Sequence, residues 1–184
     1  ASASACSSAE DGTSLTGYAR SWTTVSGELK TDENQTGWTS ADEFRSWDNN
    51  ASSTEPAVIE ATTEFSGGLA GATYAVSLDV VVGAGTSPNG VQDQAVQIDV
   101  IVGGIAHKLV WVLATTVWGG ESARGGMSTS APGISPPVTY TLEGLTLEQS
   151  SIVVVRYRFT LDPTADVNHD IWVQNLEVVQ TACS

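Results

Sequence analysis

The strongest constraint on the fold is a hydrophobic period of two residues. Residues 73–82 (TYAVSLDVVV), 96–102 (VQIDVIV) and 151–161 (SIVVVRYRFTL) alternate apolar with polar side chains over most of their length. Successive side chains of a β-strand point to opposite faces of a sheet, so this period gathers the apolar residues on one face. The three segments are therefore predicted to be antiparallel strands with one buried and one exposed face.

The same rule predicts further strands over residues 18–26, 57–65, 105–115, 138–143 and 170–180. Gly, Pro, Ser and Asn separate them, as turns require. No segment has a convincing helical period, although SADEFRSW (40–47) would fit a short turn of helix. Half-buried strands in this number bury their apolar faces only if two sheets stack. The sequence predicts an all-β, single-domain antiparallel β-sandwich, jelly-roll-like, with 8–9 strands over residues 1–184 and a tail over residues 1–10.

Composition narrows the partners. The chain of 184 residues has 7 Lys and Arg against 21 Asp and Glu, a formal net charge of −14. Nucleic acids and anionic membranes attract basic surfaces, so neither is expected as a partner. No stretch approaches the roughly 18 apolar residues of a membrane span. Hydrophobic residues make up 41% of the chain and include six Trp, which indicates a packed core rather than disorder.

The two ends of the chain suggest export. Residue 1 is not Met, and the opening ASASACSSAE is rich in Ala and Ser, as residues next to a signal-peptidase cut often are. We expect a mature N-terminus of a secreted, extracellular or cell-surface protein; a trimmed chain is the alternative. The two cysteines, Cys6 and Cys183, lie near the two ends, and an even pair in an exported chain predicts a disulfide within one chain. Free thiols or a bridge between subunits stay open.

Two stretches carry a resemblance to known families. FSGGLAGATYAVSLDV (65–80) resembles the early strands of secreted carbohydrate-binding jelly rolls, and YRFTLDPTADVNHDIWVQNLEVV (157–179) resembles their last hairpin. Sandwiches of this kind also build extracellular fibres, including biofilm-matrix fibres and the tubular cannulae of hyperthermophilic archaea. The resemblance implies a surface or matrix role, and a shared fold does not decide which one.

One acidic loop is a candidate calcium site. Asp166, Asn168 and Asp170 have the D-x-N-x-D spacing of an oxygen-rich loop, and Asp162 lies just upstream. Calcium prefers such oxygen ligands, with His169 expected to be a bystander. The sixth position is Ile171 rather than Gly, which excludes an EF-hand. The alternative is an acidic, solvated turn.

Catalytic motifs are not recognisable, so no catalytic residue is assigned. The chain has two His, neither of them in an HExxH pattern, and no G-x-S-x-G motif. Glu60 and Glu64 share one strand face, but about 13 Å along a strand exceeds the spacing that glycoside hydrolysis needs. Exposed Trp side chains would form a platform for sugars, whereas buried ones would fill the core. Trp38 and Trp47, in a polar, turn-rich stretch, are expected to be exposed.

Two predicted strands look apolar on both faces. Residues 109–114 (LVWVLA) and 171–179 (IWVQNLEVV) carry apolar side chains on each side, so the second face needs a loop or another subunit to cover it. The tail residues Ala1, Ser2, Ala3, Ser4 and Ala5 have no apolar anchor and are expected to pair with a sheet edge, in the same molecule or a neighbouring one.

Three function classes follow. The first is a non-enzymatic extracellular structural protein that self-assembles, as a homo-oligomer or polymer, into a filament, tube or coat. The second is a carbohydrate-binding jelly-roll module with polysaccharide as its partner. The third and weakest is a secreted glycoside hydrolase. Calcium is the one cofactor expected.

Overall fold

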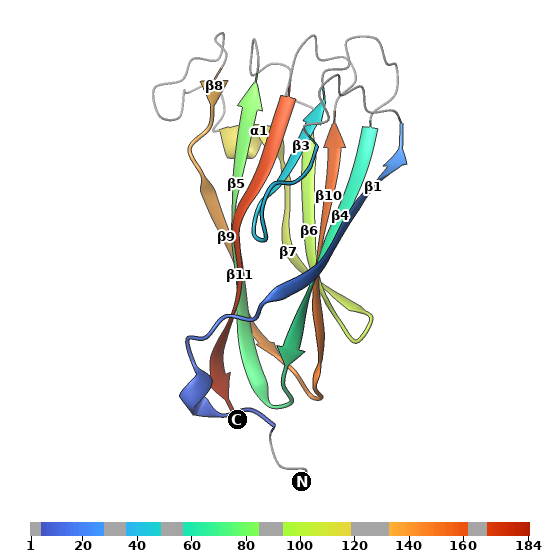
Figure 1. The fold of residues 1–184 in the computed structure, drawn as a ribbon. Helices are drawn as coiled ribbons and strands as arrows, with labels where there is room; N and C mark the ends of the chain where they lie inside the picture. Colours follow the sequence, from blue (N-terminus) through green and yellow to red (C-terminus); the bar gives the residue numbers. More distant parts are fainter. Residues whose placement is uncertain (1–4, 28–35, 49–56, 85–93, 119–132, 162–168) are drawn as a thin grey trace.

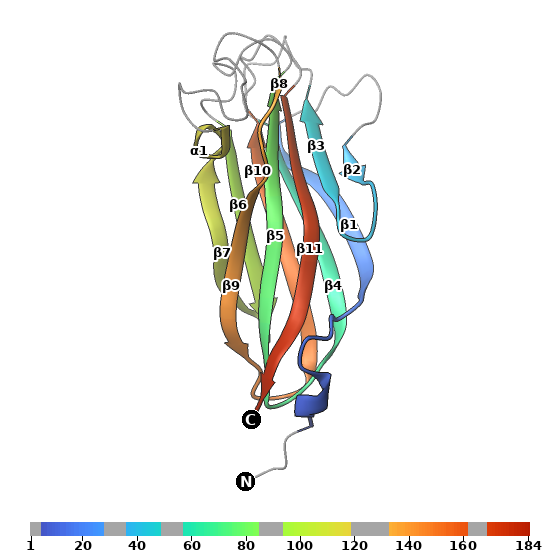
Figure 2. The same cartoon turned by 90° about the vertical axis from the view of Figure 1, so that its left-hand side faces the viewer.

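The computed structural model confirms the predicted antiparallel β-sandwich. It describes residues 5–27, 36–48, 57–84, 94–118, 133–161 and 169–184. Two sheets stack face to face, and the short helix near the start of the described chain lies at the same end of the molecule as the C-terminus (Figures 1 and 2). No helix of the described residues is long and apolar enough to cross a membrane.

Each sheet has a defined strand order. The five-stranded sheet runs β1 (Gly17–Ser26), β4 (Ala57–Gly68), β10 (Ser151–Leu161), β6 (Ala95–Val102) and β7 (Ile105–Leu113). The six-stranded sheet runs β2 (Gly37–Trp38), β3 (Phe44–Asp48), β11 (His169–Cys183) and β5 (Ala72–Ala84), with β8 (Gly133–Ile134) and β9 (Val138–Thr146) both paired to β5. The chain changes sheet at seven of the ten steps between successive described strands: β1 to β2, β3 to β4, β4 to β5, β5 to β6, β7 to β8, β9 to β10 and β10 to β11. This repeated crossing is the jelly-roll-like wrapping that the pattern predicted.

The described residues contain eleven strands instead of eight or nine. The three additions, β2, β3 and β8, have only two to five residues. In β3, Phe44 and Ser46 are buried and Arg45 between them is half-buried, so the segment expected to fit a helical turn has the period of a strand. The strand predicted to reach residue 115 ends at Leu113, because Ala114 and Val117, three residues apart, both turn into the core from the short helix α1 (Ala114–Trp118).

The core is filled by the inward residues of both sheets and has an aromatic centre. Phe44 of the six-stranded sheet stacks on Phe159 of the five-stranded sheet, with ring centroids 5.6 Å apart. Tyr157 packs edge-on to Phe159 at 6.2 Å. Trp38 closes the cluster at 5.2 Å from Phe44 and 5.5 Å from Tyr157. These contacts join the two sheets along one side of the sandwich.

The predicted Cys6–Cys183 disulfide is confirmed within one chain. It fixes the N-terminal segment, residues 5–15, to the edge of β11. Backbone hydrogen bonds run from Gly12 N to Gln180 O at 2.7 Å and from Leu15 N to Val178 O at 2.8 Å. The short 3-10 helix η1 (Ser8–Glu10) in this segment has no buried residue. The segment is therefore held mainly by the disulfide and by backbone pairing, and Leu15 adds a partly buried contact with the core.

Strand β11 shows why its sequence looked apolar on both faces. Its pairing with β5 slips between Gln174 and Glu177, and Asn175 adopts a left-handed φ of 55°. The slip exchanges the faces, so that Ile171 before it and Leu176 after it both point into the core. The expected outside cover is not needed for this strand. In β7 the second face is different, since Trp111 and Leu113 are about half exposed, at 51% and 52%.

Candidate functional site

The outer face of the five-stranded sheet carries two adjacent rows of charged and aromatic side chains. In one row the register aligns Glu60, Arg158, Gln97 and Trp111 across β4, β10, β6 and β7. The next row aligns Thr62, Arg156, Asp99 and Lys108. The residues between them along each strand, such as Ala61, Tyr157 and Ile98, are fully buried, so both rows face outward. These eight residues are called the charged band below.

Trp111 is the largest exposed side chain of the charged band. Its indole Nε1 donates a hydrogen bond to Asp99 Oδ1 at 3.1 Å. The Lys108 ammonium lies 5.2 Å from the indole centroid, within cation–π range. The ring is thus held at its nitrogen and by a neighbouring cation while half of its surface stays open to solvent. A flat apolar surface in a fixed orientation is the main requirement for stacking a ligand ring.

Asp99 is the centre of a hydrogen-bonded network beside the indole. Only 7% of Asp99 is exposed, because Trp111 and Arg156 cover its carboxylate. Arg156 Nη2 donates to Asp99 Oδ2 at 3.1 Å. One row away, Arg158 Nη1 lies 4.0 Å from Glu60 Oε2. The part-exposed Arg156, Arg158 and Glu60 side chains offer donors and an acceptor side by side on one surface.

The charged band also concentrates the few cations of an acidic chain. Three of the seven Lys and Arg residues, Lys108, Arg156 and Arg158, lie in it. Glu60 and Asp99 balance two of these charges, so the local charge is close to neutral while the whole chain carries −14. At the far edge of the same sheet, the Tyr18 hydroxyl hydrogen-bonds to Glu64, which raises the pKa of Tyr18.

A β-bulge creates the contact between Lys108 and Trp111. Residues three apart in a regular strand face opposite sides of the sheet. The pairing of β6 with β7 slips here: Ile98 pairs with Val110, but the next residue, Asp99, pairs with Lys108. Leu109 is the extra residue, and it returns Lys108 to the outer face that Trp111 occupies. The sequence analysis therefore missed this cluster, because strict alternation separates its two members.

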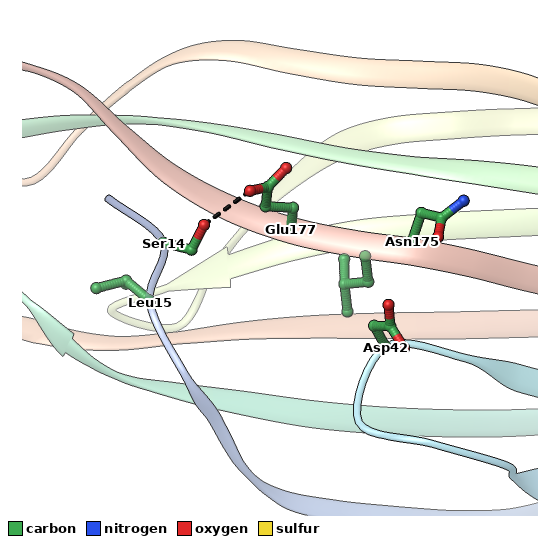
Figure 3. Close-up of a pocket in the computed structure, with 6 residues that line it drawn as sticks. Ser14, Leu15, Asp42, Asn175 and Glu177 are labelled. Atoms are coloured by element: carbon green, nitrogen blue, oxygen red, sulfur yellow. Dashed lines mark hydrogen bonds between the residues drawn. The ribbon is translucent and has the colours of Figure 1, made fainter. Parts of the chain in front are cut away.

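A depression lies beside β11, between the part of its edge that pairs with β3 and the part that pairs with the N-terminal segment (Figure 3). It has a volume of about 340 Å³ and is lined by Ser14, Leu15, Asp42, Asn175, Leu176 and Glu177. Ser14 Oγ donates to Glu177 Oε1 at 2.7 Å, and Leu176 N donates to Asp42 O at 3.3 Å. Its two carboxylates are too few for a metal cage, and the described residues contain no group of three or more His, Cys, Asp or Glu that could hold an ion.

The structure describes only some of the residues that the sequence predicted to bind calcium. Asp162, Asp166 and Asn168 lie outside the described residues, and Asp170 is described only through its backbone pairing with Trp47 and Gly83. Calcium binding by these four residues stays a prediction, which calorimetry on the wild type and Asp170→Ala would test.

The expected tryptophan platform is only partly described. Trp38 is half-buried rather than exposed, since its ring packs into the aromatic cluster and its Nε1 donates to Ser21 O at 3.1 Å. The side chain of Trp47 lies outside the described residues. Sugar binding by this pair stays untested. Trp111, by contrast, is an exposed indole that the structure describes within a polar network. From the sequence alone it could either have filled the core or formed part of a sugar platform.

The assembly residues are likewise described at one position. Residues 1–4 lie outside the described part of the chain. Ala5 N donates to Ala70 O of its own chain at 3.1 Å, so this end of the tail is attached to its own molecule.

Comparison with protein-family models finds no match, and comparison with curated proteins finds none. Solved structures with a similar fold include TmCBM61 in complex with β-1,4-galactotriose, at 8% identity, covering 88% of each chain, with a TM-score of 0.48. The adhesin domain of Epf from Streptococcus pyogenes is 9% identical over 93% of this chain and 65% of that chain, with a TM-score of 0.49. A pentameric capsid protein from metagenomic phage sequences matches at 13% identity, over 84% and 71%, with a TM-score of 0.27. A carbohydrate-binding module and an adhesin domain are thus among the similar structures, but values this low assign neither a family nor a function to this chain.

Proposed function

We propose that the protein is an extracellular carbohydrate-binding module whose ligand lies across the charged band with one sugar ring against Trp111. The observation that carries the proposal is the half-exposed indole, fixed by its hydrogen bond to Asp99 and by the Lys108 ammonium. The intrachain disulfide supports an extracellular setting, because such bonds persist in oxidising compartments.

The chemistry of the charged band suits a saccharide. A pyranose ring presents a patch of C–H groups that packs on an aromatic face, while its hydroxyl groups both donate and accept hydrogen bonds. Next to Trp111, the part-exposed Arg156 guanidinium has further N–H donors, while the covered Asp99 carboxylate holds Arg156 and Trp111 in place. In the next row, the part-exposed Glu60 and Arg158 offer an acceptor and a donor. The four strands of the charged band extend about 14 Å at roughly 4.8 Å per spacing, enough for two or three linked sugar rings.

The near-neutral charge of the band favours a neutral sugar over a polyanion. Arg156 and Arg158 each have a carboxylate beside them, so an anionic ligand would have to compete with Asp99 and Glu60. We propose binding without turnover, because a surface row of ion pairs offers no enclosed site in which a bond would be cleaved.

The test begins with a glycan array of neutral and acidic oligosaccharides, followed by calorimetry with the strongest ligand. Trp111→Ala should weaken binding by about 2 kcal/mol or more, roughly thirtyfold, as is usual for a stacking Trp. Trp111→Phe should recover part of the affinity, because it keeps a ring but loses the bond to Asp99. Leu113→Ala, on the same strand and equally exposed, is the matched control and should bind like the wild type. Equal affinity of Trp111→Ala and wild type would refute the proposal.

Self-assembly remains a second candidate function. It is favoured by the exposed apolar residues Ile105, Trp111 and Leu113 along an edge strand. Light scattering and negative-stain microscopy, with and without salt and calcium, would detect a filament, tube or coat. A chain that stays monomeric throughout would exclude this second candidate.

A further inference from the structure

In the described part of the chain, the two sheets end on the same side of the sandwich in edge strands. β7 is the last strand of the five-stranded sheet, and β9 pairs only with β5 in the other sheet. The two strands contact each other across the sandwich and run side by side in Figure 2. An edge strand exposes unpaired N–H and C=O groups, which can bond to another strand. This side of the molecule therefore presents two such edges together.

On the opposite side of the sandwich, the sheet edge is less available to an added strand. There β1 is the edge of the five-stranded sheet, and Trp38 Nε1 from β2 already donates to Ser21 O on β1. A backbone acceptor used by an indole is not free for an incoming strand. The side formed by β7 and β9 is therefore the better surface for adding strands.

β7 and β9 run in opposite directions. β7 has the direction of β10, because β7 is antiparallel to β6 and β6 is antiparallel to β10. β9 passes into β10 through a turn of four residues, 147–150, so its direction is the reverse (Figure 2). A two-fold axis parallel to the strands keeps each strand direction and exchanges the two sheets. It therefore places β7 of each copy beside β9 of the other, and the strands of both pairs are antiparallel.

We propose that two copies of this chain dimerise edge to edge about such an axis, with β7 of each copy paired to β9 of the other. Each five-stranded sheet then continues into the six-stranded sheet of the second copy. The interface is isologous and closed, so it yields dimers and not an open chain. β7 and β9 both contain nine residues, so the two paired edges have equal length.

The charges of the two edges are complementary. β7 (IAHKLVWVL) contains Lys108 and His107 and no acidic residue, whereas β9 (VTYTLEGLT) contains Glu143 and no basic residue. Pairing like edges would bring two Lys or two Glu side chains together and is disfavoured. Pairing β7 with β9 brings Lys108 of one copy towards Glu143 of the other, once on each side of the two-fold axis.

The heights of these charges along the strands also agree. His107 lines one cavity together with Leu145 and Thr146, so these parts of β7 and β9 lie beside the same opening. Lys108 and Glu143, one and two residues further along antiparallel strands, are then close in height. The proposed axis therefore pairs Lys108 with Glu143 of the second copy.

Exposed apolar groups surround this edge. Ile105 is 65% exposed at the start of β7, and Leu113 is 52% exposed at its end. The cavity between the β6–β7 turn and the β9–β10 turn, about 550 Å³ and partly lined by Ile105 and Leu147, opens on the same part of the molecule. A second copy would cover apolar surface at both ends of the paired strands.

The dimer has a consequence for the charged band. The two-fold axis turns the outer face of the five-stranded sheet of the second copy to the opposite side. Two copies of Trp111 would then face opposite directions near the centre of a dimer. The dimer interface itself requires no sugar, so its test is independent of the proposed binding function.

The experiment is sedimentation velocity on the full oxidised chain at several protein concentrations, at about 0.15 M salt. The wild type should show a monomer–dimer equilibrium. Lys108→Glu and Glu143→Lys should each raise the dimer dissociation constant at least tenfold, because each brings like charges together. The double variant Lys108→Glu with Glu143→Lys should restore the dimer. Glu64→Lys, on the outer face away from this edge, is the control and should dimerise like the wild type.

Circular dichroism of each variant establishes that it is folded. A wild type that remains monomeric up to about 1 mM would overturn the proposal. So would a dimer that both single reversals leave unchanged, since such a dimer would use another surface. Failure of the double variant to recover, with each single variant folded and monomeric, would also contradict the pairing of these two residues.

Discussion

Tyr157 is a buried polar residue whose hydroxyl has no hydrogen-bond partner among the described residues. Its ring packs against Trp38, Phe44 and Phe159, so the aromatic part contributes to the core. Burial raises the pKa of Tyr157 well above its usual value, and the Asp42 carboxylate raises it further. A buried hydroxyl without a partner costs stability, because it has lost its bonds to water.

Tyr157→Phe should therefore stabilise the protein by about 1 kcal/mol, because it keeps the ring and removes the unpaired hydroxyl. In the wild type the unfolded chain loses the phenol proton near pH 10, while the folded protein retains it to higher pH. Stability from this residue is thus complete below about pH 10 and is lost as the pH rises towards the folded pKa. Urea unfolding at pH 7 and pH 11 should show a larger gain at pH 11. A destabilised variant at pH 7 would mean that the hydroxyl has a partner.

Gly68 is a second residue with a specific steric role. A Cβ atom at this position would overlap the backbone oxygen of Ser151 and approach Leu147 Cδ1 at 2.9 Å. Ser151 is the register partner of Gly68 on β10, so the close approach belongs to the pairing of β4 with β10.

Gly68→Ala should destabilise the protein by about 1–3 kcal/mol, the usual cost of forcing extra volume into a packed site. Gly17→Ala is the matched control, because its Cβ would meet only side-chain atoms, with Thr63 Oγ1 nearest at 3.3 Å. Thermal unfolding of both variants compares them directly. Equal losses in the two variants would contradict the steric argument.

At the scale of elements, β-bulges mark the limit of what the sequence could predict. β5 and β10 were predictable because five or more alternate residues are apolar and every one turns to the core. β4 has four such residues, with the buried Thr63 among them. The slips in β7 and β11 depend on which strands pair with each other, and the sequence of one strand does not identify its pairing partner. The face exchange in β11 and the contact between Lys108 and Trp111 both follow from such slips.

The same limit applies to the candidate site. The charged band joins residues of four strands that lie up to 98 positions apart in the sequence, from Glu60 to Arg158. Trp38 was expected to be exposed because its neighbours in the sequence are polar, yet tertiary contacts with Phe44 and Tyr157 bury it by half. By contrast, the Cys6–Cys183 bond was predictable, since only two cysteines are available.

The N-terminal segment is the element whose stability depends most on a covalent bond. Replacing both Cys6 and Cys183 by Ser should cost about 2–5 kcal/mol, because the bond joins residues 177 positions apart and restricts the unfolded chain. Hydrogen exchange should show faster opening at Gly12 N and Leu15 N, which pair with β11. At Val155 N, in the centre of β10, protection should fall only by the amount that corresponds to the loss in the free energy of global unfolding. Equal losses at all three amides would show that the segment opens only with the whole domain.

The whole molecule separates a hydrophobic core from two chemically different outer surfaces. One outer face carries the charged band, with three of the seven basic residues of a chain whose net charge is −14. The strands that end the two sheets carry opposite charges, Lys108 and Glu143. The two proposals share Lys108, which lies both in the charged band and on the edge strand β7, so recognition is tested through Trp111 and pairing through the combined reversal of Lys108 and Glu143.

The central claim is that a sugar binds across the outer face of the five-stranded sheet. The most direct measurement is a titration of isotopically labelled protein with the best oligosaccharide from the array, followed by backbone and indole amide NMR. The largest shifts are expected at the Trp111 Nε1–H and at the amides of Gln97, Asp99 and Arg156, which lie together in two rows of the sheet. Shifts confined to the depression beside Glu177, or the absence of binding to any oligosaccharide on the array, would contradict the claim.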